Sequence, residues 1–321
     1  MDKLKRTLTL PYLLFYGVGV IIGAGIYSII GAAAGQAGRG VWVSLLLAAV
    51  PAALAALCYA ELSSQFPRAG ASYVYVREAL PQWHWPGFMI GFIVVCTTAA
   101  TAATVSIAFG GYLSVFLSWP YWLSASVLLV ACTVVNLIGI RESAWVTAIC
   151  TAIEVIGLVL IIGAGVASHN VTEGLFEFDH NGGQAWDGIF AAAALSFFVF
   201  TGFEGLANLA EETKKPKRDL PLALLISLAF TTILYLLVAV AVTALLEPAQ
   251  LARSDSPLAS AATAADPRLG TALTWIALFS TANTVLITVV VGSRLLYGMA
   301  NEGDMPGALA RTLPRRRTPW V

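Results

Sequence analysis

Long apolar stretches dominate the hydrophobic pattern of the chain. A bilayer core about 30 Å thick requires about 20 apolar residues in a helix that crosses it. Stretches of at least this length carry at most one Asp, Glu, Lys or Arg residue; they run over residues 7–38, 40–60, 79–140, 145–167, 188–210, 220–246 and 269–293. The pattern therefore predicts an all-α protein built from membrane-spanning helices.

The third of these stretches is too long for one crossing. Residues 79–140 contain 62 positions without a formal charge, and a straight helix of that length would extend about 93 Å. The sequence Leu-Ser-Trp-Pro-Tyr-Trp at residues 117–122 offers a turn. Two helices are expected here, which brings the total to about eight spans.

The composition agrees with this class and excludes others. Hydrophobic residues make up 58% of the 321 positions and charged residues 11%, whereas soluble domains have about 25% charged residues. Equal numbers of basic and acidic residues, 18 each, give no net charge, so we expect no nucleic-acid partner. The four cysteines lie in apolar stretches without a CxxC motif, and no catalytic or metal-binding grouping accompanies the three histidines. We expect neither an enzyme nor a metal site.

The basic residues predict the orientation. If successive loops alternate between the two sides, 15 of the 18 Lys and Arg residues fall on one side, and only Arg39, Arg253 and Arg268 fall on the other. Because cytoplasmic loops carry an excess of Lys and Arg, both termini are expected in the cytoplasm. The lipid bilayer, here the cytoplasmic membrane, is the first expected partner.

Glycines interrupt the first span near its middle. Gly17, Gly19, Gly23 and Gly25 fall within nine residues. One interpretation is close helix packing through small residues, since the segment contains a GxxxG pattern. The other is an unwound point at residues 23–25, where the N-terminus of the following half-helix presents amides and a positive dipole to an anion.

A second interruption lies in the span at residues 188–210. Gly202 and Gly205 flank Glu204 there. Paired broken helices are typical of a transporter binding site near the membrane midplane. Glu204 has two open interpretations: a carboxylate that accepts hydrogen bonds from local amides at a helix end, or a functional acid.

Glu154 is the one charged residue of its 23-residue span. Desolvation of a carboxyl group at this depth favours its protonated form, as a proton relay requires. A hydrogen bond to a neighbouring helix, without any role in proton transfer, is the alternative.

Ordered motifs then resemble those of the amino acid, polyamine and organocation (APC) permease superfamily. They are Gly19–Tyr27, Tyr59–Leu62 with Phe66–Tyr73, Phe200–Glu204 with Glu211–Glu212 and Asp219–Pro221, and Arg294–Ala300. The similarity spans nearly the whole chain. It implies a LeuT-type fold, in which two inverted five-helix repeats surround unwound helices one and six.

The resemblance also implies a substrate site. The substrate carboxylate would meet the amides of Gly23, Ala24 and Gly25, and its amino group would meet the carbonyls of Ile21, Phe198 and Thr201, with Gly202 beside them. Glu204 occupies an acidic position that some relatives use in gating. An α-amino acid zwitterion fits such a site without a fixed charged side chain.

Glu154 departs from the family pattern. Several proton-coupled relatives carry a lysine at this position, where its charge takes the place of a sodium ion. A glutamate would instead attract a cation or bind a proton, and a titratable group there favours proton coupling over sodium. Oxygens of Ser280, Thr281, Asn283 and Thr284 could still supply sodium ligands. No other cofactor is expected.

A second departure is the length. We expect one permease domain over residues 1–321, with repeat one at about 7–167, an incomplete repeat two at about 188–300 and a cytoplasmic tail at 301–321. Relatives usually have about twelve helices, so helices nine to twelve would be missing. The expected function is secondary active transport of an amino acid or related amine, by symport or exchange. The alternative is a transport-incompetent permease that binds a ligand or partner; a second copy or a separate subunit could supply the missing helices.

Overall fold

The computed structural model describes residues 4–23, 25–114, 116–168, 183–254, 256–313 and 318–319. Within these ranges the chain is helical, with two isolated β-bridges and no strand. The α-helices are α1 (Leu10–Ile22), α2 (Gly25–Ala37), α3 (Val41–Gln65), α4 (Ala71–Ala79), α5 (His84–Leu113), α6 (Tyr121–Ile138), α7 (Ile140–Ala167), α8 (Gly183–Phe200), α9 (Pro216–Leu245), α10 (Pro248–Ala252), α11 (Pro257–Ala265) and α12 (Pro267–Asn301). The 3₁₀ helices are η1 (Gly38–Gly40), η2 (Phe203–Glu212) and η3 (Gly307–Ala310).

The number of membrane-length elements agrees with the sequence. In the described part of the chain, eight helical stretches are long and apolar enough to cross a membrane. The expected turn lies between the end of α5 at Leu113 and the start of α6 at Tyr121. The span expected at residues 7–38 contains α1 and α2, and the one expected at residues 188–210 contains the end of α8 and most of η2, so both predicted interruptions are present. The residue limits of the two repeats stay a prediction.

Several helix ends differ from the expected limits. Helix α12 continues to Asn301, eight residues beyond the expected end at Ser293, and α7 begins at Ile140 rather than at residue 145. The expected limits were set where charged residues occur. A charged side chain can nevertheless lie in a membrane helix when it is near the helix end or has a buried partner. The short helices α4, α10 and α11 lie in loops that carried no span signal.

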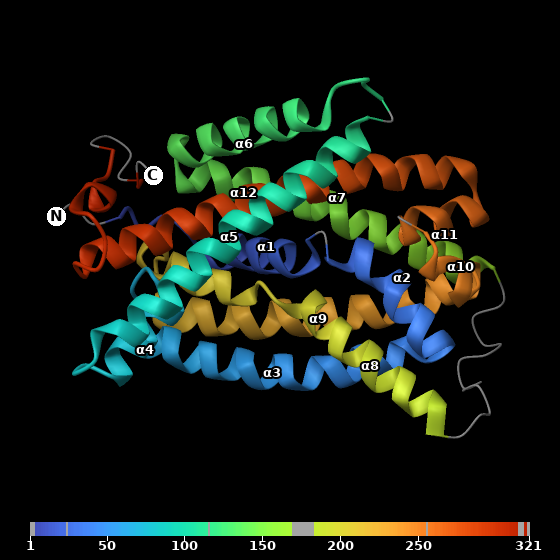
Figure 1. Ribbon diagram of the computed structural model, residues 1–321, viewed down its shortest axis with the longest axis horizontal. Coiled ribbons are helices and arrows are strands. Elements are labelled where there is room, and N and C mark those ends of the chain that lie inside the picture. Colours follow the sequence, from blue (N-terminus) through green and yellow to red (C-terminus); the bar gives the residue numbers. More distant parts are fainter. Residues whose placement is uncertain are drawn as a thin grey trace.

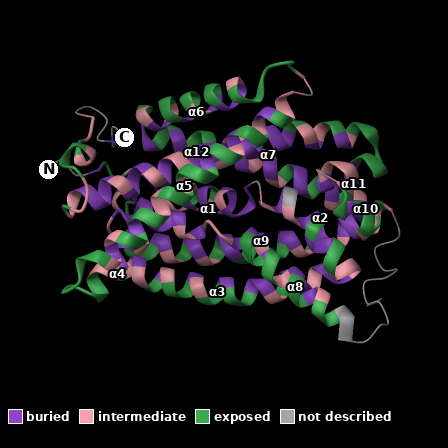
Figure 2. Cartoon of the chain, in the orientation of Figure 1, coloured by how far each residue is buried: buried purple, intermediate pink, exposed green. Residues whose placement is uncertain are grey.

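Two groups of helices pack around the first broken helix. Helices α8 and α9 both pack on α3, and α1 packs on α9, while α5 and α6 pack on α12 (Figure 1). Helix α7 contacts α1, α9 and α12 and so joins the two groups. Buried residues concentrate along α1, α9 and α12, in the middle of the molecule (Figure 2).

The outer faces of the bundle are apolar. Large exposed side chains on α3 and α6 include Val50, Leu54, Val130 and Val134, each at least 50% exposed. A hydrophobic outer surface around a core that contains polar groups is the arrangement that a lipid environment requires.

Both ends of the chain lie at the same end of the bundle (Figure 1). Leu4 packs with Ala69 and Tyr297, and the Thr318 hydroxyl donates to the Leu137 carbonyl at the end of α6 at 3.4 Å. An even number of crossings predicts this placement. Backbone amides of Thr7 and Leu8 also donate to the Glu212 carbonyl at 2.9 and 3.0 Å, which ties the start of the first broken helix to the end of the second.

A buried arginine network joins the two helix groups at this end. Arg294 on α12 is fully buried, and its Nε and Nη2 donate to the two carboxylate oxygens of Glu212 at 3.1 Å each. Arg294 Nη1 donates to Asn136 of α6 and, at 2.9 Å, to Ser293. The bidentate pairing explains how α12 carries a charge inside the protein.

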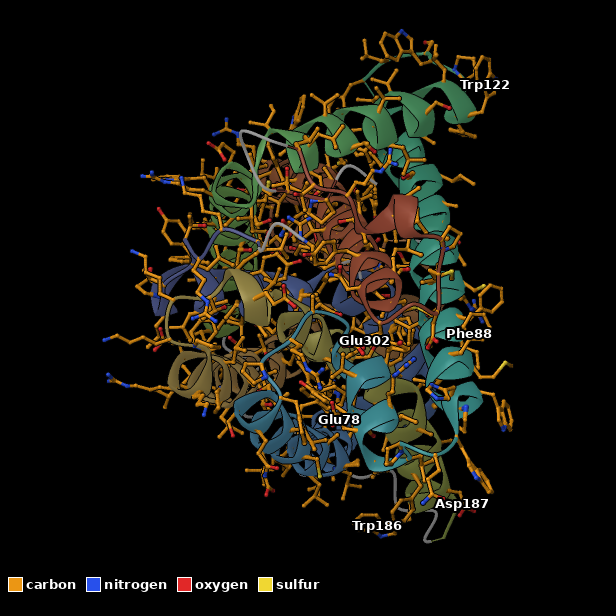
Figure 3. The ribbon with its side chains drawn as sticks, turned by 90° about the vertical axis from the view of Figure 1, so that its left-hand side faces the viewer. Glu78, Phe88, Trp122, Trp186, Asp187 and Glu302 are labelled. Atoms are coloured by element: carbon orange, nitrogen blue, oxygen red, sulfur yellow. The ribbon has the colours of Figure 1, made fainter. Side chains whose placement is uncertain are left out.

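A second ionic cluster lies nearer the surface of the same end. Arg68 pairs with Glu78 and with Glu302, the latter at 3.1 Å, and Arg77 pairs with Asp304. Figure 3, which looks at this end of the bundle, shows Glu78 and Glu302 near each other. Burial raises the pKa of Asp304, but hydrogen bonds from Arg77 and Tyr73 outweigh it and leave the pKa below its ordinary value. The cluster fastens the loop after α3 to the end of α12.

Candidate functional site

The first helix breaks between Ile22 and Gly25. Gly23 adopts φ +35° and ψ −155°, and its N–H still donates to the Gly19 carbonyl at 3.0 Å. This positive φ is readily available to glycine. Helix α2 then begins at Gly25, so its N-terminal turn faces the break. Of the sequence-predicted site residues, Ala24 lies outside the described residues.

The second break follows Phe200. The Thr201 N–H and hydroxyl both donate to the Phe198 carbonyl, at 3.1 and 2.7 Å, and Gly202 adopts φ +110°. The chain continues as the ten-residue 3₁₀ helix η2 rather than as an α-helix. Because 3₁₀ runs rarely exceed four residues, such a segment marks strain or a hinge.

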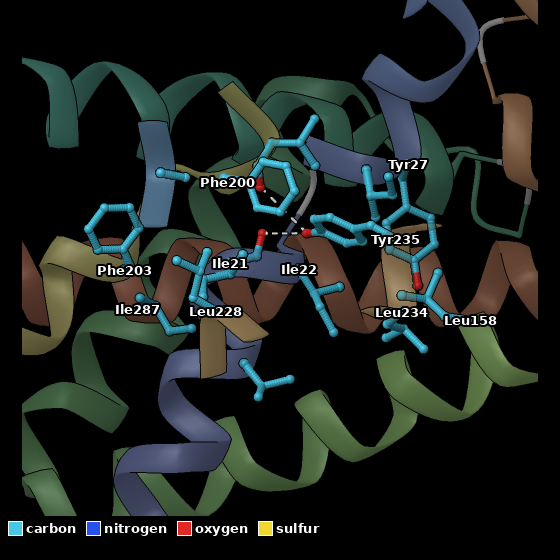
Figure 4. Close-up of a cluster of buried hydrophobic side chains, with 14 of the residues drawn as sticks. Ile21, Ile22, Tyr27, Leu158, Phe200, Phe203, Leu228, Leu234, Tyr235 and Ile287 are labelled. Atoms are coloured by element: carbon cyan, nitrogen blue, oxygen red, sulfur yellow. Dashed lines mark hydrogen bonds between the residues drawn. The ribbon is translucent and has the colours of Figure 1, made fainter. Parts of the chain in front are cut away.

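The two breaks lie against each other. A Cβ atom added to Gly202 would lie 2.9 Å from the Val20 carbonyl oxygen, and one added to Gly25 would lie 3.5 Å from Val199 Cα. Tyr235 of α9 bridges them: its hydroxyl is 2.8 Å from the Ile21 carbonyl oxygen and 3.5 Å from that of Val199 (Figure 4). The fold therefore brings both predicted interruptions into one place, which is the candidate site.

Replacing Gly202 by alanine is expected to destabilise the chain by about 1–3 kcal/mol, because φ is left-handed there and the new methyl group meets a backbone oxygen. Thermal unfolding in detergent measures the loss. Gly111→Ala is the matched control, since nothing lies within 4 Å of its added Cβ atom. Equal melting temperatures for the two variants would show that the contact at Gly202 is not a constraint.

Glu154 lies beside the first break. The side chain is fully buried on α7; Asn283 of α12 donates its amide Nδ2 to Oε1 at 3.1 Å, and that nitrogen lies 3.3 Å from the Thr151 hydroxyl. A Cβ atom added to Gly19 of α1 would meet Thr151 and Asn283. The second carboxylate oxygen, Oε2, has no hydrogen-bond partner among the described residues. An interhelical hydrogen bond at Glu154 was the structural alternative, and the structure contains it.

The four residues of α12 that were named as possible sodium ligands make different contacts. Ser280 donates to the Gly23 carbonyl at 2.9 Å, so it contacts the break itself. Asn283 contacts Glu154. The hydroxyl groups of Thr281 and Thr284 bond to carbonyls of their own helix. Among these four, therefore, only Ser280 and Asn283 form side-chain hydrogen bonds between helices. The Thr284 hydroxyl also lies beside the break, 3.2 Å from a Cβ atom added to Gly23.

Glu204 accepts a hydrogen bond from the Gly202 N–H at 2.8 Å, as the interpretation of a local helix-end carboxylate predicts. Its role in gating stays a prediction. The carbonyl of Phe198 already accepts both groups of Thr201, and that of Ile21 accepts Tyr235. The structure thus places Ile21, Gly23, Gly25, Phe198, Thr201 and Gly202 at the breaks, while their contacts with a substrate stay predictions.

Three functional candidates carried no clear sequence signal. Tyr235 is a lone phenol in an apolar span, a weak signal by itself. Ser280 was named from the sequence only as one of four possible sodium ligands, because hydroxyl residues are common in membrane helices. Tyr27 is buried in α2 with a hydroxyl that has no partner among the described residues. These three residues become functional candidates only because the fold brings them next to the breaks or to Glu154.

Comparisons with known proteins agree with this geometry. A family model described as amino acid permease matches residues 8–321. The chain is 31% identical over 344 residues to the branched-chain amino acid permease BcaP of Bacillus subtilis, covering 99% of this chain and 72% of that protein. It is 33% identical over 338 residues to cationic amino acid transporter 9, chloroplastic, of Arabidopsis thaliana, covering 98% of this chain and 58% of that protein.

Among solved structures, the chain is similar to MhsT in complex with L-phenylalanine, with a TM-score of 0.68 at 15% identity over 93% of this chain and 75% of that one. An Eremococcus coleocola manganese transporter gives a TM-score of 0.55, also at 15% identity, over 92% of this chain and 68% of that one. At this identity the likeness shows the fold alone, which is of LeuT type.

Proposed function

The chain belongs to the amino acid permease family, and on this premise we propose that it carries an amino acid, or a related amine, across the cytoplasmic membrane by alternating access. The observation that carries the proposal is the meeting of two broken helices, at Gly23 and Gly202, in the interior of the bundle. The family and its relatives are multi-pass membrane transporters rather than enzymes.

The chemistry of the breaks supports a zwitterionic substrate. The N-terminal turn of α2 carries the positive end of a helix dipole and suits a carboxylate. The Ile21 carbonyl, at the end of α1, keeps one lone pair beside the bond from Tyr235, and the Thr201 carbonyl follows the end of α8, so both suit an ammonium group. The Phe198 carbonyl would have to exchange one of its two bonds from Thr201 to join them. Relatives are named for branched-chain and for cationic amino acids. Both kinds of amino acid carry the α-carboxylate and the α-ammonium group, so recognition by backbone amides and carbonyls fits either kind.

Proton coupling through Glu154 is the second part of the proposal. The carboxyl group is fully buried and accepts a hydrogen bond from the neutral amide of Asn283, and no Lys or Arg side chain among the described residues forms an ion pair with it. A proton neutralises such a group with less reorganisation than a bound metal ion, which needs several oxygen ligands. Sodium is the competing coupling ion, and the transport measurement below separates the two.

The orientation follows from charge. The end of the bundle with Arg68, Arg77 and Arg294 carries the expected excess of basic residues. Arg39 in η1, Arg253 after α10 and Arg268 in the first turn of α12 lie at the other end. We assign the first end to the cytoplasm, together with both termini. Association with a second copy or a separate subunit stays a prediction.

Uptake into proteoliposomes tests the transport proposal. Labelled L-leucine, L-arginine and a polyamine are offered to the purified chain with and without an imposed proton gradient, and with a sodium gradient. We expect saturable amino acid uptake that the proton gradient increases. Binding without uptake would favour the transport-incompetent alternative, and uptake driven by sodium alone would contradict proton coupling.

Replacing Glu154 by glutamine is expected to flatten the pH dependence of uptake. The protonated fraction of a carboxyl group falls about tenfold for each pH unit above its pKa, whereas the amide mimics the protonated form at every pH. Initial rates of uptake between about pH 5.5 and pH 8 measure the effect. Glu142→Gln, an exposed position in the first turn of the same helix, is the control. A pH profile of Glu154→Gln that matches the control would refute the proton role.

A further inference from the structure

We propose that Ser280 transmits the protonation state of Glu154 to the break in the first helix. The inference rests on the proposed coupling role of Glu154 and assigns the path by which that residue acts. The Ser280 hydroxyl donates to the Gly23 carbonyl at 2.9 Å. Ser280 lies one helical turn from Asn283, whose amide donates to the Glu154 carboxyl group at 3.1 Å. The same turn of α12 thus contacts both the titrating group and the hinge.

The hydroxyl has a single hydrogen and two competing acceptors. In the structure this hydrogen points to Gly23, and Oε2 of Glu154 has no partner among the described residues. Asn283 cannot supply the missing donor from its present position, since its Nδ2 contacts Oε1 and Thr151. A buried carboxylate oxygen without a donor is costly, and more so when it is charged.

The two protonation states therefore favour different arrangements. A protonated Oε2 can donate to the Ser280 oxygen while Ser280 donates to Gly23, which forms a continuous chain of hydrogen bonds. An ionised Glu154 instead attracts the Ser280 hydrogen, because bonds to charged acceptors are the stronger ones. The Gly23 carbonyl then loses its donor from α12, and the break loses its tie to that helix.

Glu154 is the group that changes charge in this region. The other titratable groups that act on it, among the described residues, are Tyr27 of α2, Tyr235 of α9 and Cys150 of α7 itself. Tyrosine and cysteine are ordinarily neutral at the pH values of interest. From α12, Asn283 donates a hydrogen bond to Glu154, and Ser280 lies one helical turn from Asn283; both side chains are uncharged.

The consequence for transport lies at the N-terminal turn of α2. Gly23 lies two positions before Gly25, the first residue of that turn, so a bond that holds its carbonyl on α12 also holds the proposed carboxylate site in place. Proton binding at Glu154 would strengthen substrate binding through this bond, and proton release would loosen it. Proton binding would then raise the affinity for the substrate by the same factor by which substrate binding raises the affinity for the proton.

The dissociation constants of labelled L-leucine and L-arginine for the purified chain, measured at about pH 5.5 and pH 8, test the inference. We expect Glu154→Gln to bind at both pH values as the unaltered chain does at low pH, because the amide can still donate to Ser280. Ser280→Ala should bind about tenfold more weakly than the unaltered chain at low pH and lose the pH dependence. Adding Glu154→Gln to Ser280→Ala should change nothing further.

Two further variants guard against a folding defect. Ser280→Cys keeps the size of the side chain and a weak donor, so its pH dependence should be reduced rather than lost. Thr281→Val removes a neighbouring hydroxyl that bonds only within α12 and should leave the pH dependence intact.

The outcomes separate this inference from the function on which it rests. A pH dependence that survives in Ser280→Ala and in Ser280→Cys, but disappears in Glu154→Gln, would overturn the relay and leave proton coupling standing. A pH dependence unchanged in Glu154→Gln would overturn the coupling itself. Absence of saturable binding in the unaltered chain would overturn the proposed function.

Discussion

Replacing Arg294 by methionine is expected to destabilise the folded chain by about 3–5 kcal/mol. The guanidinium is fully buried and bonds both oxygens of Glu212, whose side chain is also buried. Removing one partner leaves the other charge uncompensated in the interior, and it also removes a donor from Asn136. Thermal unfolding in detergent, followed by binding of a thiol dye or by tryptophan fluorescence, measures the loss.

The controls for this prediction come from the same network and the same helix. Arg268→Met, at an exposed position in the first turn of α12, should change stability little. Adding Glu212→Gln to Arg294→Met should recover part of the loss, since the unpaired charge is then removed. If Arg294→Met unfolds at the same temperature as Arg268→Met, the pair does not hold the two helix groups together.

Replacing Gly25 by leucine is expected to weaken substrate binding by at least about a hundredfold, or roughly 3 kcal/mol. A Cβ atom at this position lies in ordinary contact with Val199, so alanine fits. The three further carbons of leucine need the space between α2 and α8, where the substrate is proposed to lie. Equilibrium binding of labelled L-leucine and L-arginine to the purified variants measures the effect.

Gly25→Ala and Gly163→Leu are the matched controls. Gly163 is exposed on α7 with nothing within 4 Å of an added Cβ atom, so leucine there faces the surroundings of the bundle. Both controls should bind substrate with near-normal affinity. Normal affinity in Gly25→Leu as well would place the substrate elsewhere.

The positions of both breaks could be predicted from the sequence because glycine carries the signal locally. Gly23 and Gly202 adopt positive φ angles, and close approach of the two chain segments leaves no space for a side chain at Gly202. Glu154 was likewise visible as a single charge in an apolar span. In each case the informative residue is of a type that is unfavourable in its own helix: a glycine in the helix interior, or a charged residue in an apolar span.

Long-range contacts set the limit of such prediction. The expected end of the last span at Ser293 was wrong because Glu212, the partner that allows Arg294 to be buried, lies 82 positions away in the chain. The bonds from Tyr235 to Ile21 and from Ser280 to Gly23 join residues separated by 214 and 257 positions. Nothing in the local pattern around a tyrosine or serine distinguishes these contacts from packing.

The central claim is that an amino acid zwitterion binds between the two breaks, and a competition measurement tests it most directly. Labelled L-leucine or L-arginine is bound to the purified chain and displaced with the unlabelled amino acid, its methyl ester or its N-acetyl derivative. The account predicts that the free amino acid competes, and that each derivative competes at least about tenfold more weakly, because each lacks one of the two charged groups. Equal competition by the ester or the N-acetyl compound would contradict recognition by the helix ends at Gly25 and Ile21.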